Sequence, residues 1–264
     1  MKPTGPGFCF VAPAYANSVP LEQFIPDVAP GSRVVLDLPA RLFPMLRDGR
    51  ADAALIPVAD LFPHAELDMI DGLGICARRR VRSVLLRCRR PLDQVRTVRL
   101  DPASRTSNAL AMLLIRDHWK LPARAIAPDD PAEADAAVVI GDRALKEPAP
   151  PGGDCDLAEH WNRMTGLPFV FAVWSFRRGE PRAAEMAEIL HAAKRAGVAA
   201  LSEIARQQAR KLGLSEAVCL DYYSTCIYYD AGAEEREAMR VFRERTEGLL
   251  GALPYGRRGT EEQI

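Results

Sequence analysis

Short apolar runs alternate with amphipathic segments along the first two-thirds of the chain. The runs have the length and composition of buried strands. They lie at Phe8–Val11, Arg33–Leu36, Ala53–Ile56, Val81–Cys88, Thr97–Leu100 and Ala136–Ile140. Helical patterns follow most of them. This alternation predicts an α/β fold with a mostly parallel sheet.

After one more apolar strand at Phe169–Phe176, the pattern becomes helical only. Apolar positions recur at helical spacing over Met186–Ala193 and over Leu201–Ala205, and Gly197 between them is a candidate for the residue that ends the first helix. Two further helices are expected over about Glu216–Tyr229 and Ala233–Leu250.

The long apolar strands Val81–Cys88 and Phe169–Phe176 bracket a block that has strands and helices of its own. We expect them to be the two crossings of a hinge. One lobe then comprises residues 1–88 and 170–264, and an inserted lobe comprises residues 89–169. Ligands of open α/β sheets lie beyond the carboxyl ends of strands, so a ligand cleft is expected between the lobes.

The segment Asp101-Pro-Ala-Ser-Arg-Thr-Ser107 stands where a strand passes into an amphipathic helix. The first amides of a helix have no intrahelical partner and attract anions. Hydroxyls at Ser104, Thr106 and Ser107, with the Arg105 guanidinium, make this turn a candidate carboxylate or phosphate site. The alternative is that serine and threonine simply cap the helix.

Two other strand ends carry polar side chains, Asn17 after the first strand and Asp142 after the last strand of the inserted block. Asn17 can orient a hydroxyl group, or it can cap the following segment. Asp142 fits a capped strand-to-helix turn at least as well as a binding role. Residues Glu147–Gly153 are expected to form a surface loop, and the polar tail from Gly256 to Ile264 is expected to fray.

Composition narrows the class of partner. The 264 residues include 35 basic and 35 acidic side chains, so bulk charge does not favour nucleic acid or an anionic membrane. A small molecule is the expected partner. No secretory leader pattern is found at the start, which favours a cytoplasmic location.

The six cysteines and four histidines show no metal-ligand spacing, so free buried thiols and no metal are expected. Nucleotide-binding glycine loops, zinc-protease motifs and serine-hydrolase elbows do not occur in the sequence. The residues by themselves therefore favour a two-lobed α/β protein with an anion cleft, and leave open whether it is an enzyme or a binding protein.

Taken together in order, six segments resemble the menaquinone-pathway chorismate dehydratases over residues 10 to about 245. The segments are Tyr15-Ala-Asn17, Asp52-Ala-Ala-Leu-Ile-Pro57, Val81-Arg-Ser-Val-Leu-Leu86, Asp101-Pro-Ala-Ser-Arg-Thr-Ser107, Ile140-Gly-Asp-Arg-Ala-Leu145 and Thr165-Gly-Leu-Pro-Phe169. The resemblance implies a two-lobed fold like that of periplasmic binding proteins. It also implies a cytoplasmic enzyme of the futalosine route, which removes water from chorismate to give 3-[(1-carboxyvinyl)oxy]benzoate without metal or organic cofactor.

The resemblance also implies roles for single residues. Asn17 matches a position near the reacting hydroxyl, and Ser83 matches the polar residue of the first hinge strand. Ser104, Thr106 and Ser107 match the carboxylate-binding helix start, and Asp142 matches a position in a Gly-Asp-x-Ala-Leu motif.

The chain departs from the family pattern at two positions. Val58 stands where a serine is common, and Arg80 stands where a glycine is usual. A lost hydroxyl at position 58 removes one hydrogen bond, on the order of 1 kcal/mol. Two alternatives therefore stay open: a related lyase of the same pathway that forms dihydroxynaphthoate, and a cytoplasmic carboxylate-binding sensory module without catalysis.

Overall fold

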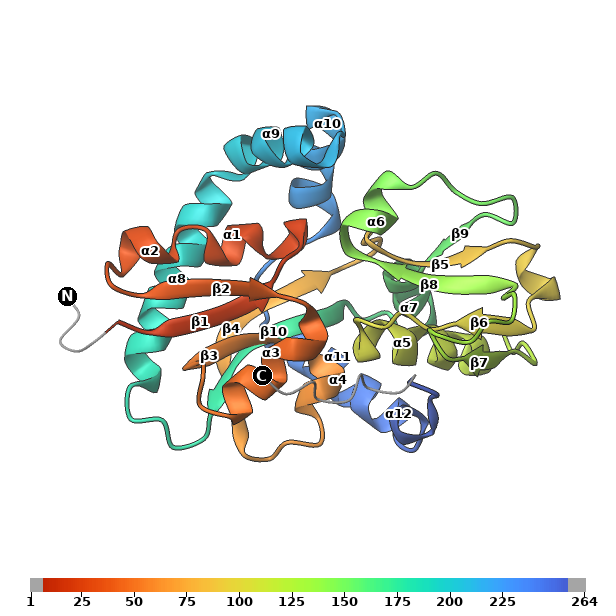
Figure 1. The fold of residues 1–264 in the computed structure, drawn as a ribbon, viewed down its shortest axis with the longest axis horizontal. Coiled ribbons are helices and arrows are strands. Elements are labelled where there is room, and N and C mark those ends of the chain that lie inside the picture. Colours follow the sequence, from red (N-terminus) through yellow and green to blue (C-terminus); the bar gives the residue numbers. More distant parts are fainter. Residues whose placement is uncertain (1–6, 256–264) are drawn as a thin grey trace.

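The computed structural model describes residues 7–255, which fold into two lobes, each built around a five-stranded mixed sheet (Figure 1). The first sheet has the strand order β2-β1-β3-β10-β4, and the second has the order β7-β6-β8-β5-β9. The strands of the first sheet are β1 (Cys9–Pro13), β2 (Arg33–Asp37), β3 (Ala53–Pro57), β4 (Leu67–Ala77) and β10 (Phe169–Arg177). Those of the second are β5 (Val84–Cys88), β6 (Thr97–Arg99), β7 (Arg124–Ile126), β8 (Ala136–Ile140) and β9 (Asp154–Asp156).

Helices cover both faces of each sheet. In the first lobe they are α1 (Val19–Glu22), α2 (Ile25–Val28), α3 (Pro39–Arg47), α4 (Val58–Leu61), α8 (Ala183–Ala199) and α9 (Leu201–Leu212). In the second they are α5 (Arg105–Asp117), α6 (Gly141–Lys146) and α7 (Leu157–Thr165). The remaining helices, α10 (Glu216–Asp221), α11 (Ala233–Arg245) and α12 (Leu249–Ala252), come from the C-terminal part of the chain.

Alternation along β1 explains how the first sheet is buried on both sides. Phe8 and Phe10 face the core shared with α1 and α2, whereas Cys9 and Val11 face a second apolar cluster under α3. Successive side chains of a strand point to opposite faces, so an all-apolar run is what a doubly covered sheet requires.

The pairing is less parallel than the sequence pattern predicts. Strands β1, β2 and β3 pair in parallel, as do β6, β7 and β8. In contrast, β10 runs antiparallel to β3 and β4, and β5 runs antiparallel to β8 and β9. The reason is that β5 and β10 are the strands by which the chain enters one lobe and returns to the other, so they run against their neighbours.

The expected first hinge strand needs correction. Only Val84–Cys88 is extended as β5, and it pairs with β8 and β9 of the second sheet, so it does not belong to the first lobe as the division at residue 88 had it. The strand that leads out of the first sheet is β4, which the sequence pattern missed. Residues 78–83 connect β4 to β5, and residues 166–168 connect α7 to β10.

The C-terminal helices also differ from the expected ones. Helix α8 runs through Gly197 without ending, so this glycine is not the residue that terminates the helix. A Cβ at this position would lie 1.9 Å from the carbonyl oxygen of Pro20. Glycine is therefore required by the close packing of α8 on α1. The helix expected over Glu216–Tyr229 stops early: α10 passes into a π-helical turn at Tyr222–Cys226, after which Tyr228 bridges to Cys76 of β4.

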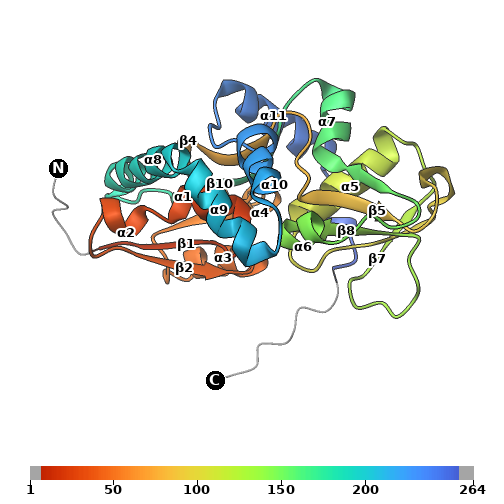
Figure 2. The ribbon, with the colours of Figure 1, turned by 90° about the horizontal axis from the view of Figure 1, so that it is seen from above.

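A buried aromatic cluster lies where the second crossing enters the first sheet. Trp161 of α7, Phe169 of β10 and Phe242 of α11 pack edge to face, with ring centroids 4.9 to 5.8 Å apart. Seen from above in Figure 2, α7 and α11 meet beside the junction of the two lobes. The main hydrophobic core thus continues from one lobe into the other through this cluster.

Glu22 gives the first lobe a pH-dependent stability. The side chain lies buried between α1 and α9, and burial raises its pKa from 4.5 to about 7, against the opposing attraction of Lys211. The folded state therefore holds this proton more tightly than the unfolded state does. Stability from this group is present below the unfolded pKa and is lost as the pH rises from 4.5 to about 7.

We expect Glu22→Gln to raise the free energy of unfolding at pH 8 by roughly 1 to 3 kcal/mol, because a neutral amide avoids the cost of a buried charge. At pH 5 the variant and the wild type should differ little. Urea unfolding at both pH values measures this, with Glu188→Gln on the exposed face of α8 as the control. A gain that is equal at pH 5 and pH 8 would contradict the assignment.

Candidate functional site

A cavity of about 50 Å³ lies between the lobes, at the carboxyl ends of strands from both sheets. Its polar lining contains most of the residues singled out in the sequence. These are Asn17, Ser83, Ser104, Thr106 and Ser107. Apolar walls come from Ile75, Val81, Val84, Ile140 and Phe171.

The turn before α5 places three hydroxyls at one end of this cavity. Ser104 is the N-cap of α5, and its Oγ accepts a hydrogen bond from the Ser107 amide at 3.1 Å. The turn itself is held by Asn108, whose side chain both accepts from the Asp101 amide and donates to the Asp101 carbonyl. The capping interpretation is therefore correct for Ser104, which caps through the Ser107 amide, whereas the Thr106 hydroxyl contacts the Ala59 amide of the other lobe.

The hydrogen bonds of these hydroxyls determine what they can offer a ligand. Thr106 Oγ1 accepts from the Ala59 amide at 3.0 Å, and Ser107 Oγ accepts from Ser104 Oγ at 2.9 Å. Ser83 Oγ lies 2.8 Å from the Tyr222 hydroxyl. Within residues 7–255, the hydroxyl protons of Thr106 and Ser107 meet no protein acceptor, so they remain available to an oxygen atom in the cavity.

Asn17 supplies the complementary group. Its Oδ1 is buried and has no hydrogen-bond partner in the described part of the chain. A buried acceptor without a partner costs free energy, and a ligand hydroxyl or amide donor would remove that cost. The cavity therefore combines donors at the α5 end with an unsatisfied acceptor beside Asn17.

Two of the predicted site residues lie outside the lining. Asp142 accepts a hydrogen bond from the Ala16 amide at 3.0 Å, which links the second lobe to the segment that carries Asn17. Arg105 pairs with Asp60 at 3.3 Å and lies over the ring of Tyr255. Both residues bridge the lobes.

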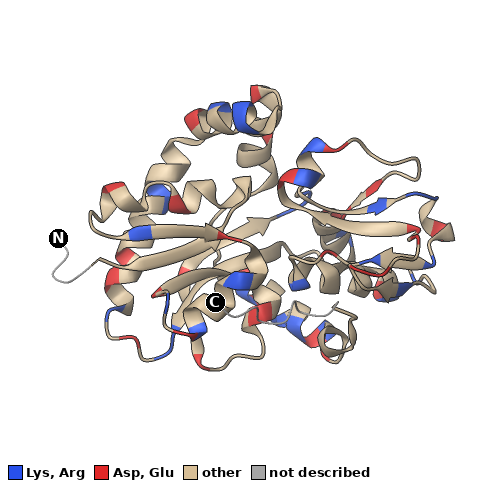
Figure 3. Ribbon diagram, in the orientation of Figure 1, with Lys and Arg blue, Asp and Glu red and all other residues tan. Residues whose placement is uncertain are grey.

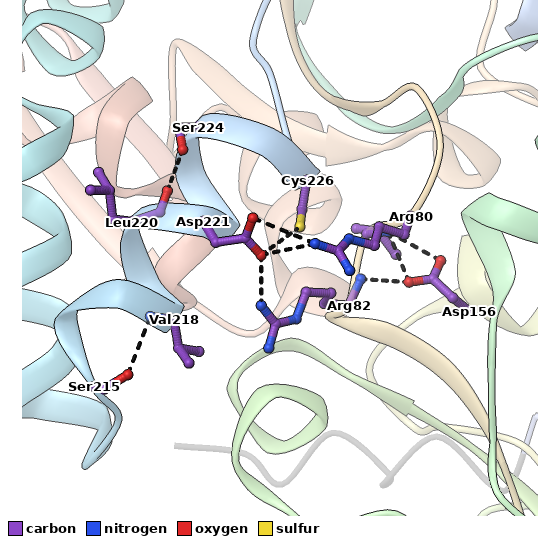
Figure 4. A network of polar contacts seen from close by, with 10 residues as sticks. Arg80, Arg82, Asp156, Ser215, Val218, Leu220, Asp221, Ser224 and Cys226 are labelled. Carbon is purple, nitrogen blue, oxygen red and sulfur yellow. Dashed lines mark hydrogen bonds and ion pairs between the residues drawn. The ribbon is translucent and has the colours of Figure 1, made fainter.

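The first crossing is held from both sides (Figure 4). The Asp156 carboxylate of the second lobe accepts the backbone amides of Val81 and Arg82 at 2.9 and 2.7 Å. From α10, the Asp221 carboxylate pairs with the guanidinium groups of Arg82 at 2.9 Å and Arg80 at 3.1 Å. Arg82 has a positive φ of 61°, a strained conformation for a side chain with a Cβ, and these contacts hold it there.

Tyr15 is a lining residue that sequence reasoning did not single out. Its ring packs on Gly141, where a Cβ would lie 2.9 Å from the ring and where φ is +63°. Burial, with nearby Asp101 and Asp142, raises the pKa of Tyr15 to about 12, so its hydroxyl stays protonated. The sequence feature that could have indicated Tyr15 is its position two residues before Asn17, after the first strand.

The two departures from the family pattern are also located. Val58 is buried and does not line the cavity, although its neighbour Pro57 does. Arg80 pairs with Asp221 and reaches no cavity atom. Neither residue thus takes the place of a polar group in the lining.

The distribution of charged and metal-ligating side chains over the described residues does not point to a second site. Basic and acidic residues are interspersed over both lobes (Figure 3). Among residues 7–255, no three His, Cys, Asp or Glu side chains gather as metal ligands do, and no helix is long and apolar enough to cross a membrane. The cysteines are free thiols, of which Cys155 is half-buried and the others are buried.

The fold resembles several solved structures. A protein from Archaeoglobus fulgidus superposes with a TM-score of 0.67 at 14% identity, covering 92% of this chain and 97% of that one. The periplasmic aliphatic sulphonate-binding protein of Escherichia coli superposes with a TM-score of 0.61 at 15% identity, covering 93% of each chain. Two lobes, two crossings and a cavity between strand ends define the chain as having the periplasmic-binding-protein-like fold.

Sequence comparison is more specific. The menaquinone biosynthesis family matches residues 12–248, and the chain belongs to this family. A chorismate dehydratase from Thermus thermophilus is 30% identical over 253 residues, which cover 88% of this chain and 92% of the relative. A chorismate dehydratase from Campylobacter jejuni is 30% identical over 215 residues, which cover 80% of this chain and 82% of the relative.

Thr106 joins the lobes, so its hydroxyl should matter for stability as well as for binding. We expect Thr106→Ala to lower the free energy of unfolding by about 1 to 3 kcal/mol, because the buried Ala59 amide loses its acceptor. Thr106→Ser keeps the acceptor and should lose less than half as much. Urea unfolding of both variants measures the difference. If Thr106→Ala were as stable as Thr106→Ser, the hydrogen bond to Ala59 would contribute nothing to stability.

Proposed function

We propose that this protein is a chorismate dehydratase, a hydro-lyase that converts chorismate to 3-[(1-carboxyvinyl)oxy]benzoate for menaquinone biosynthesis. The observation that carries the proposal is a set of hydroxyl groups that line the same cavity as an unpaired Asn17 oxygen. Chorismate offers two carboxylates to such donors and a ring hydroxyl to such an acceptor. Family membership and the dehydratase relatives support the same reaction.

The turn before α5 would bind one carboxylate. Hydroxyl protons of Thr106 and Ser107 and the first amides of a 13-residue helix converge there, and each favours negative charge. Ser83 also lines the cavity and would meet the second anionic group or the leaving oxygen. The ring would lie against Phe171 and Tyr15.

Asn17 would orient the departing hydroxyl. Dehydration breaks the C–O bond of the ring hydroxyl and the C–H bond of the adjacent ring carbon, and the new double bond completes an aromatic ring. Overall, one proton and one hydroxide are lost, which amounts to one water. Positioning and support of the developing charge are then the main tasks of the protein.

Within the cavity lining we find no histidine, aspartate or glutamate that would remove the ring proton. Tyr15 has a raised pKa and holds its own proton, which makes it a poor base. We therefore assign this step to a carboxylate of the substrate itself. A chorismate analogue that lacks the enolpyruvyl carboxylate tests the assignment, because rapid dehydration of that analogue would refute it.

Arg105 and Asp142 take supporting roles in this proposal. Both were expected to bind substrate, but their contacts with Asp60 and with the Ala16 amide instead link the closed lobes. A cytoplasmic location stays a prediction from the sequence, as does activity without a cofactor.

Incubation with chorismate tests the function directly. Loss of one water by mass and appearance of a benzoate absorption band are expected. Conversion of another substrate of the same pathway, with chorismate left unchanged, would favour the sister lyase that forms dihydroxynaphthoate. Tight binding of chorismate without any conversion would favour a carboxylate-sensing module.

We expect Asn17→Ala to lower kcat by about tenfold to a hundredfold with a smaller change in KM, because its contact strengthens as the C–O bond breaks. Asn17→Asp should be at least as impaired, since a carboxylate would lie close to a dianionic substrate. Steady-state kinetics on chorismate measure both. Wild-type rates in the two variants would remove Asn17 from the mechanism.

The cavity is far smaller than the roughly 300 to 1,000 Å³ usual for ligand sites, so substrate entry requires the lobes to part. We propose rotation about residues 78–83 and 166–168. Small-angle scattering should give a smaller radius of gyration with the benzoate product bound than without it. The same scattering curve in both states would mean that the lobes do not move on binding.

A further inference from the structure

Tyr222 lies directly behind the cavity, in the π-helical turn after α10. Its hydroxyl is 2.8 Å from Ser83 Oγ, although 139 residues separate the two in the chain. Tyr222 is 2% exposed and Ser83 is fully buried. Ser83 reaches the cavity and Tyr222 does not, so any effect of Tyr222 on a ligand must pass through Ser83.

The direction of this hydrogen bond follows from what each hydroxyl could do otherwise. If Ser83 donated, the phenol proton of Tyr222 would be buried with no acceptor in the described part of the chain, at a cost in free energy. If Tyr222 donates, the Ser83 proton points into the cavity, where a ligand accepts it. Phenols are also the more acidic hydroxyls, and hence the better donors. Tyr222 is therefore the donor and Ser83 the acceptor.

The surroundings keep both hydroxyls at this distance. Asp221, the residue before Tyr222, pairs with Arg82, the residue before Ser83 (Figure 4). Asp156 holds the amide of Arg82 from the other lobe at 2.7 Å. The pair Arg82–Asp221 thus lies next to the pair Ser83–Tyr222 in both segments. The backbone of Ser83 is restrained through Arg82, and its hydroxyl is restrained by the hydrogen bond to Tyr222.

We propose that Tyr222 is a positioning residue that fixes Ser83 as a hydrogen-bond donor to an anionic or leaving oxygen of the substrate. The phenol occupies a lone pair of Ser83 Oγ, which turns the serine proton toward the cavity and polarises it. This inference rests on the proposed function for the identity of the substrate. It also adds a requirement, namely that the ligand atom opposite Ser83 is an acceptor.

A double-mutant cycle tests the proposal. Tyr222→Phe should lower kcat/KM for chorismate about tenfold, the loss typical of one hydrogen bond. In a Ser83→Ala background the same change should cost less than twofold, because the donor through which Tyr222 acts is already gone. Tyr222 replaced by 3-fluorotyrosine, which keeps the donor, should stay within twofold of the wild type. Equal losses in both backgrounds would overturn the proposal.

Tyr229→Phe is the matched control. Tyr229 is also a buried tyrosine of this segment, but its hydroxyl has no partner among residues 7–255. The control should retain wild-type kcat/KM and melt no lower. A loss as large as that of Tyr222→Phe would mean that removal of any buried phenol disturbs the fold, and the positioning role would fall.

Binding of 3-[(1-carboxyvinyl)oxy]benzoate, measured by calorimetry in the same four variants of the cycle, separates this inference from the proposed function. Turnover by the wild type with additive losses refutes the positioning role alone. Coupled losses of affinity in a protein that does not turn over chorismate refute the function alone. If the protein does not turn over chorismate and the binding losses are additive, both the function and the positioning role are refuted.

Discussion

One carboxylate, that of Asp156, is the contact on which the relation of the two lobes depends. It accepts two amides of the first crossing and also the Ala158 and Glu159 amides that begin α7. Helix α7 ends at Thr165, and its C-cap Gly166 is the first residue of the second crossing. The same side chain therefore fixes one crossing and orients the helix that leads to the other. An aspartate at a helix start is stabilising in any case, so the cap and the connection reinforce one another.

With the crossings fixed, strand ends from both sheets meet at one cavity. Asn17 follows β1, the Ser104–Ser107 turn follows β6, and Ser83 comes from the crossing itself. Asn108 holds the turn before α5 by hydrogen bonds to the amide and the carbonyl of Asp101. The site thus places hydrogen-bonded local turns of both lobes around one cavity, which suits a ligand that must be enclosed before it reacts.

Sequence patterns predict the features of this arrangement that depend on local structure. They do not predict the contacts that depend on the tertiary fold. Buried strands and the α5 start were predictable because local periodicity and capping chemistry mark them, and the position of Asn17 after β1 followed from the same pattern. Strand β4 escaped notice because Asp68, Asp71 and two glycines interrupt its apolar positions. The Tyr222–Ser83 contact had no local signal at all, since hydrogen bonds between residues 139 apart depend on the tertiary fold. Arg105 and Asp142 were in the right segments, but their side chains turn to partners that only the folded chain supplies.

The aromatic cluster of Trp161, Phe169 and Phe242 has a thermodynamic consequence. These rings belong to α7, β10 and α11 and are buried in one core that extends through both lobes. Melting either lobe alone would also expose apolar surface of the lobe that stays folded. The chain entropy gained by unfolding one lobe would then be offset by the cost of hydrating surface on both, which disfavours partial unfolding. The lobes should consequently behave as a single cooperative unit toward heat and denaturant, with coincident transitions for probes placed in each, even under the proposed rotation of one lobe against the other.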